Sequence, residues 1–159
     1  MKKLLWTPVI TLALAAGFVA EATAQANPNQ LIAQRKGAMD LQGKYFGPIL
    51  AMVQGRMPYD AAIVQRNADY LALLTQMAWD DFQPTTASAT NTKAKEDIYK
   101  DPAKFKTAAD NMQGEVKKLV AAAKSGDQSA VGVAAKGLGG ACNACHENFS
   151  TMEWRFKVQ

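Results

Sequence analysis

The chain is poor in the side chains that most often hold metal ions and disulfide frameworks. Its 159 residues include only two cysteines and one histidine. This scarcity excludes a fold held by several disulfide bonds, a zinc site with four cysteine and histidine ligands, and a multi-histidine metal centre. Hydrophobic residues make up 48% of the chain and charged residues 20%. That composition excludes a disordered chain and is sufficient for one packed domain.

The chain also lacks a strong excess of one charge. Its 18 lysines and arginines exceed its 14 aspartates and glutamates by four, and the basic residues are scattered. A surface that binds nucleic acid requires a clustered basic stripe. We therefore expect no nucleic-acid partner.

A long hydrophobic run occurs only at the N-terminus. Two lysines precede the apolar run 4–20, and Ala22-Thr23-Ala24 follows it. This layout is typical of a secretory signal peptide. We expect residues 1–24 to be cleaved, which leaves 25–159 as a mature domain without an integral membrane segment, exported to a bacterial periplasm. An uncleaved anchor is the alternative, although a run of this length is marginal for crossing about 30 Å of hydrocarbon.

Strand signals are nearly missing, because the chain has no sustained alternation of polar and apolar residues and no Asn-Gly or Asp-Gly turns. Apolar residues instead recur at helical spacings in four segments. The sequence predicts an all-α fold, an antiparallel up-down-up-down four-helix bundle. The expected helix starts are Asn27-Pro28, Asp60, Asp101-Pro102, and Asp127 or Ser129.

One connection in this bundle is expected to be long. It runs between the second and third helices, from about Gln83 to Lys100, and is polar. A loop of this length in a compact domain is usually functional or mobile.

Both cysteines and the histidine fall within five residues, Cys142-Asn143-Ala144-Cys145-His146. The pattern Cys-x-x-Cys-His is the attachment signature of c-type haem. On a helix all three side chains share one face, so the thiols can bond to the haem vinyl groups while His146 binds the iron. A thioredoxin-like redox centre requires a βαβ setting, and a disulfide within a helix has poor geometry. The motif therefore predicts one covalent haem c, with a thiol-disulfide enzyme as the alternative.

The signal peptide, the four helices and the C-terminal motif together resemble the cytochrome c′ family, the class II c-type cytochromes. The resemblance covers the mature chain and includes several local runs. These runs are residues 32–36, 58–62, 92–95, 139–142 and 146–149.

The resemblance implies roles for residues outside the haem motif. In the family, an arginine of the first helix binds a haem propionate, and the residue four positions later faces the distal side of the iron. These positions correspond to Arg35 and Met39. Lys36 is expected to be a neighbouring haem contact, and Lys93 aligns with a loop position that touches the haem. The alternative for Arg35 is a side chain that extends to solvent at the bundle edge.

The residue at position 39 distinguishes two functional hypotheses, a gas-binding protein and an electron carrier. Many family members carry Leu, Phe or Tyr there, and their iron is five-coordinate, high-spin and open to NO or CO. Low-spin relatives carry methionine, which completes His/Met ligation and raises the reduction potential. We therefore favour ligation by His146 and Met39, although Met39 as a gap-filling core residue is the alternative. The remaining methionines lack this four-residue spacing from Arg35.

Two features of the C-terminal region depart from the family pattern. Ser150 stands where family members commonly carry a basic residue, and the tail 151–159 is longer than the usual ending. We expect the tail to continue the last helix or to dock on the bundle. The Gly139-Gly140 pair indicates either a close approach to the haem or a break in the helix.

The leading hypothesis is a periplasmic mono-haem electron carrier that is not an enzyme, because no imidazole besides His146 is available for acid-base chemistry. Its partners would be periplasmic redox proteins. The alternative is a five-coordinate cytochrome c′ that binds NO or CO. The resemblance further implies a homodimer formed through the first helices, which the sequence itself only allows.

Overall fold

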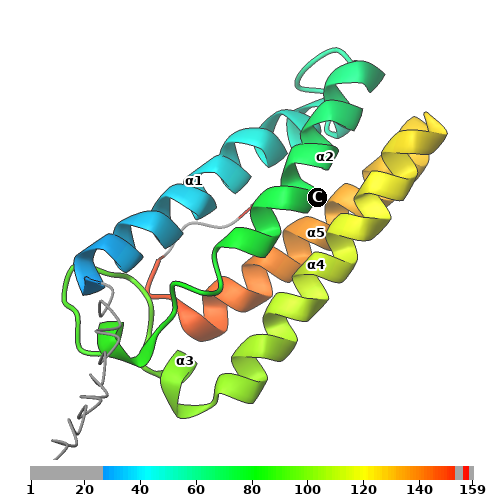
Figure 1. Cartoon of the computed structure of the whole chain (residues 1–159). Coiled ribbons are helices and arrows are strands. Elements are labelled where there is room, and N and C mark those ends of the chain that lie inside the picture. The colour runs from blue at the N-terminus through cyan, green and yellow to red at the C-terminus, as the bar shows by residue number, and fades with distance from the viewer. Residues whose placement is uncertain (1–26, 153–155, 158–159) are drawn as a thin grey trace, which may run out of the picture.

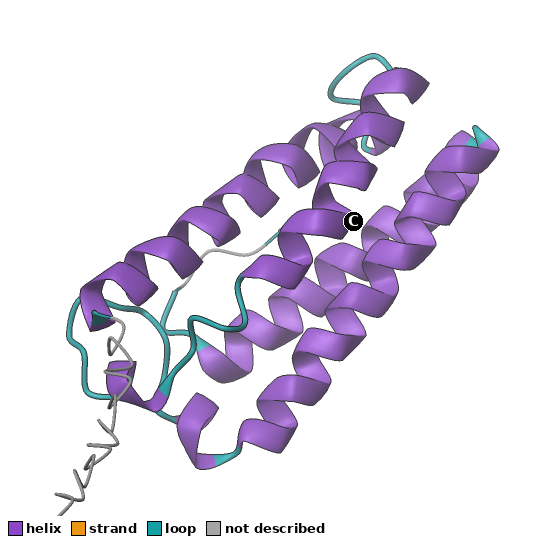
Figure 2. Ribbon diagram, viewed as in Figure 1, coloured by secondary structure: helices purple, strands orange, loops and turns teal. Residues whose placement is uncertain are grey.

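A computed structural model describes residues 27–152 and 156–157 of the chain. Four long helices form an antiparallel bundle: α1 (Pro28–Val53), α2 (Ala61–Met77), α4 (Pro102–Ser125) and α5 (Gln128–Phe149) (Figure 1). Within the described residues there is no strand, only an isolated bridge between Ala94 and Ser150 (Figure 2). The predicted all-α four-helix bundle is confirmed. The predicted signal peptide lies outside the described residues.

Each long helix begins at the polar residue that the sequence predicts as its cap. The side chain of Asn27 accepts a hydrogen bond from the backbone of Asn29, and Asp60 accepts one from Ile63. Asp101 and Asp127 cap α4 and α5 in the same way. These side-chain oxygens satisfy amide groups that the first turn leaves without a helical partner. None of the helices in the described part of the chain combines the length and hydropathy needed to cross a bilayer.

The hydrophobic core fills one half of the bundle. Most of its members lie in the C-terminal halves of α1 and α4 and the N-terminal halves of α2 and α5. Fully buried members include Ile49, Val64, Leu119 and Val131. This is the end with the two short helix connections, where close packing holds the four helices together. The opposite end contains the long connection and the Cys-x-x-Cys-His motif.

The long connection folds against the bundle. It contains a short 3₁₀ helix, η1 (Pro84–Thr86), and a four-residue helix, α3 (Asp97–Lys100). Its residues 93–95 pair with the end of α5, because Lys95 N–H donates to Phe149 O at 2.9 Å and Thr151 N–H donates to Lys93 O at 2.8 Å. Sequence periodicity missed α3, since a single helical turn is too short to show a repeat. Ile98 of α3 is nevertheless buried.

Helix α5 is continuous through its glycines, so the expected alternative of a break at Gly139-Gly140 is wrong. The helix ends at Phe149, and Ser150 adopts an extended conformation with φ −135° and ψ 147°. The tail therefore does not continue the helix. Its residue Phe156 instead packs edge-to-face on Phe46 of α1, which confirms the expectation that the tail docks on the bundle.

Candidate haem-binding site

The haem-attachment motif occupies the last two turns of α5. Cys142, Cys145 and His146 lie on one helix at spacings of three and four residues and line the same cavity. Both cysteines are free thiols. The three side chains that the motif predicts to act together are therefore gathered on one wall. Among residues 27–152 and 156–157, no group of three histidine, cysteine, aspartate or glutamate side chains is placed to hold a metal ion directly.

The cavity lies at the end of the bundle that the core leaves open. Its volume is about 160 Å³, and it is partly open to solvent. α1, the long connection, α4 and α5 all contribute to its walls. The lining is mainly apolar and includes Met39, Trp79, Phe82, Ile98, Phe105, Met112, Phe149 and Met152.

The two thiols are in a poor environment for thiol chemistry. Burial raises the pKa of Cys142 to about 12, and the neighbouring Cys145 contributes to the rise. Burial likewise raises the pKa of Cys145 to about 11. Thiol-disulfide enzymes need a lowered thiol pKa, since the thiolate is the nucleophile. The local environment therefore disfavours a redox role for free thiols at this site.

Arg35 is buried at the edge of the cavity, with only 2% of its surface exposed. Its guanidinium donates to Thr92 Oγ1 at 2.9 Å and to Thr86 Oγ1 at 3.0 Å, both on the long connection. It also donates to Tyr99 OH at 3.2 Å and lies 4.5 Å from the centroid of the Phe82 ring. The alternative of an Arg35 side chain that extends to solvent is therefore wrong.

The partners of Arg35 are all neutral. No ion pair within 4.0 Å in the described part of the chain involves its guanidinium. Asp81 contributes only its backbone oxygen, at 3.4 Å. Burial raises the pKa of the Asp81 carboxyl, Asp80 raises it further, and Arg35 opposes both. A buried cation without a paired anion is costly, so the position fits an anionic group bound in the adjoining cavity, as a haem propionate would be.

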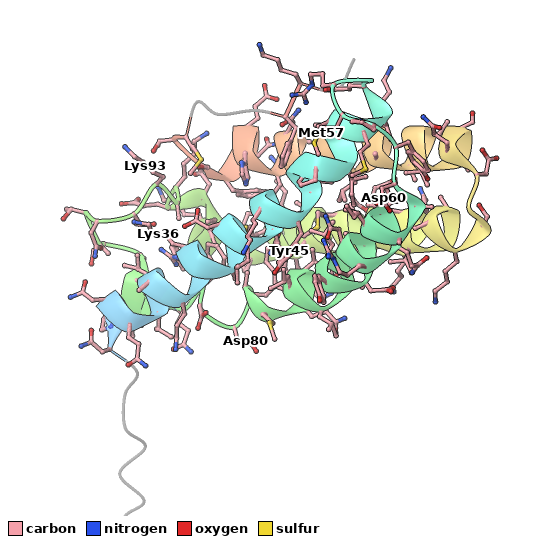
Figure 3. The ribbon with its side chains drawn as sticks, turned by 90° about the horizontal axis from the view of Figure 1, so that it is seen from above. Lys36, Tyr45, Met57, Asp60, Asp80 and Lys93 are labelled. Atoms are coloured by element: carbon pink, nitrogen blue, oxygen red, sulfur yellow. The ribbon has the colours of Figure 1, made fainter. Side chains whose placement is uncertain are left out.

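Two lysines lie at the mouth of the cavity. Lys36 of α1 and Lys93 of the long connection are exposed and contribute to the lining. Figure 3 shows both at the end of the bundle opposite Met57 and Asp60. The structure thus places these two predicted haem contacts at the site.

Met39 lies on α1 across the cavity from the α5 motif. It is half-buried and lines the main cavity together with His146. Both residues also line a smaller adjoining cavity between the helices. Met39, the predicted sixth ligand, and His146, the predicted axial histidine, therefore line the same two cavities from facing helices.

Sequence reasoning missed two further methionines and an aromatic wall. Met112 lines both cavities and Met152 lines the larger one. Phe105 lies between Phe82 and Phe149, with ring centroids 4.9 and 5.2 Å away. Phe105, Met112 and Phe149 recur at the helical spacings of the predicted third and fourth helices, but that pattern does not assign them to a haem site. Phe82 lies beyond the end of α2, where periodicity carries no signal.

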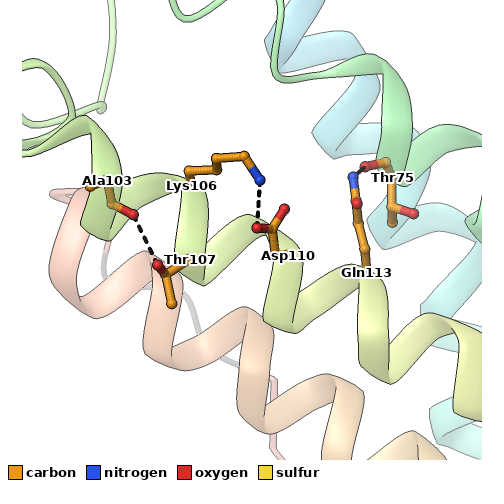
Figure 4. A network of polar contacts seen from close by, with 6 residues as sticks. All are labelled: Thr75, Ala103, Lys106, Thr107, Asp110 and Gln113. Carbon is orange, nitrogen blue, oxygen red and sulfur yellow. Dashed lines mark hydrogen bonds and ion pairs between the residues drawn. The ribbon is translucent and has the colours of Figure 1, made fainter.

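Two side chains beside the cavity donate hydrogen bonds to one backbone oxygen of α2. The side chain of Gln113 on α4 donates to the backbone oxygen of Thr75 on α2 at 2.9 Å (Figure 4). The indole N–H of Trp79 donates to the same oxygen at 2.6 Å. Met112, which precedes Gln113, and the Trp79 ring both line the cavity.

Comparison with known proteins agrees with this geometry. The family model described as "Cytochrome C'" matches residues 30–150. The chain belongs to the cytochrome c′ family. Cytochrome c′ from Rubrivivax gelatinosus is 37% identical over 122 residues, which cover 77% of this chain and 95% of the relative. As a member of this family, the chain is a c-type haem protein with one covalent haem c.

Solved cytochrome c′ structures share the bundle. The crystal structure of the Rubrivivax gelatinosus protein superposes with a TM-score of 0.76 at 36% identity, covering 79% of this chain and 98% of that one. A nitric oxide complex of a cytochrome c′ variant from Alcaligenes xylosoxidans gives a TM-score of 0.75 at 32% identity, with 81% and 99% coverage. The apolar cavity, the two thiols, His146 and the buried Arg35 fit the haem of this family.

Proposed function

We propose that the protein is a periplasmic mono-haem electron carrier in which Cys142 and Cys145 attach the haem and His146 and Met39 are its axial ligands. The observation that supports this proposal is the shared position of Met39 and His146, which line the same two cavities from facing helices. When bound, the haem supplies a one-electron Fe(III)/Fe(II) couple.

The protein's own residues set the conditions for that couple. His146 and Met39 supply an imidazole and a thioether, a ligand pair that raises the reduction potential. The aromatic side chains of Phe82, Phe105 and Phe149 give the cavity an apolar wall. Lys36 and Lys93 would contact the haem at the cavity mouth. With no second histidine in the sequence, the proposal includes no enzymatic acid-base chemistry.

A gas-binding role is the second candidate. The nitric oxide complex of the Alcaligenes xylosoxidans variant favours it, because that protein has the same fold. In this role Met39 would line the distal pocket without binding the iron, and NO or CO would take the open position. A ferric EPR spectrum distinguishes the two: a low-spin signal supports the carrier, and a high-spin signal supports the gas-binding protein.

The periplasmic location rests on residues 1–24 as a cleaved signal peptide, with 25–159 as the mature domain. Intact-mass measurement of the protein from a periplasmic extract tests this. The expected mass is that of the chain cleaved after Ala24 plus one haem. A membrane-bound chain of full length would contradict the proposal. Redox proteins of the periplasm are the proposed partners.

Arg35 provides a test of the haem contact. We expect Arg35→Leu to lower the free energy of unfolding of the haem-bound protein by about 3 kcal/mol, since several charge-assisted hydrogen bonds are lost. The reduction potential should also fall, because removing a nearby cation favours Fe(III). Denaturant titration and potentiometry measure these effects.

The matched control is Lys117→Leu, which changes an exposed cation of α4 that lines neither cavity. Its effect on unfolding should stay within about 0.5 kcal/mol. A loss of stability for Arg35→Leu with an unchanged potential would show that Arg35 only holds the long connection and does not contact the haem.

A homodimer through α1 and α2 is the proposed assembly. Apolar side chains lie exposed on this face: Leu41 at 40%, Tyr70 at 41%, and Leu73 and Met77 at 62%. Tyr70 contacts Tyr45 of α1 at a ring-centroid distance of 4.9 Å, so the two helices form one continuous surface. Exposed apolar patches of this kind mark interfaces.

We expect Leu73→Glu to convert the dimer to a monomer in sedimentation experiments, because it would bury a charge in the interface. Val133→Glu is the matched control, since Val133 is 74% exposed on α5, away from this face. A monomeric wild-type protein, or equal dissociation of both variants, would contradict the interface.

A further inference from the structure

The C-terminal tail is tied to the haem-attachment motif itself. Phe156 N–H donates to the side-chain oxygen of Asn143 at 2.8 Å, and the Asn143 side-chain N–H donates to Phe156 O at 2.8 Å. Asn143 is the first variable residue of Cys-x-x-Cys-His. The side-chain amide of Gln54, just beyond α1, donates to Lys157 O. The segment Phe156–Lys157 is thus held by hydrogen bonds from both α5 and the end of α1.

The ring of Phe156 is directed into the site between these two helices. It is half-buried and packs edge-to-face on the fully buried Phe46, with centroids 4.7 Å apart. It also lines the smaller cavity, the one that Met39 and His146 share. An aromatic side chain from the tail therefore forms part of the wall of the smaller cavity, which both proposed axial ligands also line.

We propose that Asn143 and Phe156 are positioning residues that close the α1–α5 side of the haem site against water and small ligands. The proposal rests on the haem-binding function proposed above. The side-chain carbonyl and NH₂ group of Asn143 match the backbone N–H and C=O of Phe156, which fixes the tail backbone in a single register. With the backbone fixed, the Phe156 ring occupies the space through which a diatomic molecule or water would reach the iron beside Met39.

This arrangement bears on ligation as well as on access. Thioether coordination is weak, so water and dissolved gases compete with it for the sixth position. A ring that fills the approach between α1 and α5 lowers the rate at which competitors arrive. The tail therefore favours an internal ligand over an external one, and in a five-coordinate protein it would slow gas binding in the same way.

The experiment compares wild-type haem-bound protein with Asn143→Ala and Phe156→Ala. The first measurement is amide hydrogen exchange at Phe156, which is independent of iron chemistry. The second is the rate of CO binding to the reduced protein. Asn148→Ala is the matched control, because Asn148 is exposed on the same helix and its side chain donates only to Ala144 O within α5.

We expect slow exchange at Phe156 in the wild type and faster exchange in Asn143→Ala. CO binding should be faster by about tenfold in both variants, as loss of two hydrogen bonds or of the ring lowers the barrier to access. The control should match the wild type. If Asn143→Ala impairs haem attachment, Phe156→Ala still tests the proposal, because Phe156 lies outside the attachment motif.

Two results would overturn the proposal. One is rapid exchange at Phe156 in the wild type, which would show that the tail is not held by Asn143. The other is an unchanged CO rate in Phe156→Ala. A failure of Met39 to bind the iron is distinguishable from these two results, because it would give a high-spin spectrum in the wild type. In that case the CO-binding rate of Phe156→Ala relative to the wild type would still test the role of the tail.

Discussion

Replacing Cys142 and Cys145 together by alanine is expected to abolish covalent haem attachment completely. The two thiols are the only ones in the sequence, and both line the cavity beside His146. Without thioether bonds, haem would be retained only through axial ligation and packing, and it would be lost in acid acetone. Intact mass and the pyridine haemochrome spectrum of the variant and the wild type measure the effect.

The same variant should be much less stable than the wild type. The cavity has a volume of about 160 Å³, and unfilled apolar space costs free energy because the lining loses its contacts. Ala144→Ser is the control, since Ala144 is exposed within the same motif. It should keep the haem and the wild-type midpoint in urea. A wild-type chain that purifies without haem and with two titratable thiols would contradict this account and favour a thiol-disulfide enzyme.

The second large effect is expected for Met39→Leu. This substitution keeps the apolar volume and removes only the thioether sulfur. The ferric iron should change from low-spin to high-spin, and the reduction potential should fall, because a methionine ligand raises it. CO should then bind at the vacated position. EPR, optical spectra and potentiometry of the purified variant check each of these expectations.

Met112→Leu and Met152→Leu are the matched controls for Met39. Met112 lines both cavities and Met152 lines the larger one, so each is a methionine at the same site. Both variants should keep the low-spin spectrum. If Met112→Leu abolishes it and Met39→Leu does not, the ligand comes from α4 and the assignment to α1 is wrong.

Much of the bundle could be predicted because its signals are local. Asn27, Asp60, Asp101 and Asp127 each cap a helix with their own side chain, and a cap depends only on residues within one turn. The helical stripes that end in the haem motif are equally local. Cys142, Cys145 and His146 required no knowledge of the fold, since their spacing alone brings them onto one face.

The parts of the site that could not be predicted depend on long-range packing. Met112 lines the cavity where α4 packs against α2, and its neighbour Gln113 bonds there to Thr75, 38 residues earlier in the chain. Phe156 reaches it because Asn143 binds the tail backbone. Neither position differs by type or spacing from an ordinary core or tail residue.

Arg35 shows how a resemblance and a structure complement each other. The resemblance predicts its role toward a propionate, whereas the structure shows that it also joins the long connection to α1 through Thr86 and Thr92. The same guanidinium therefore holds one wall of the cavity and offers a buried positive charge to its contents. Sequence periodicity alone could not separate these roles, because they involve residues more than 50 positions away.

The most direct test of the account is the EPR spectrum of the ferric wild-type protein at neutral pH. Ligation by His146 and Met39 predicts a low-spin signal with no high-spin component. A predominantly high-spin signal would contradict six-coordinate ligation and the electron-carrier function that we derive from it.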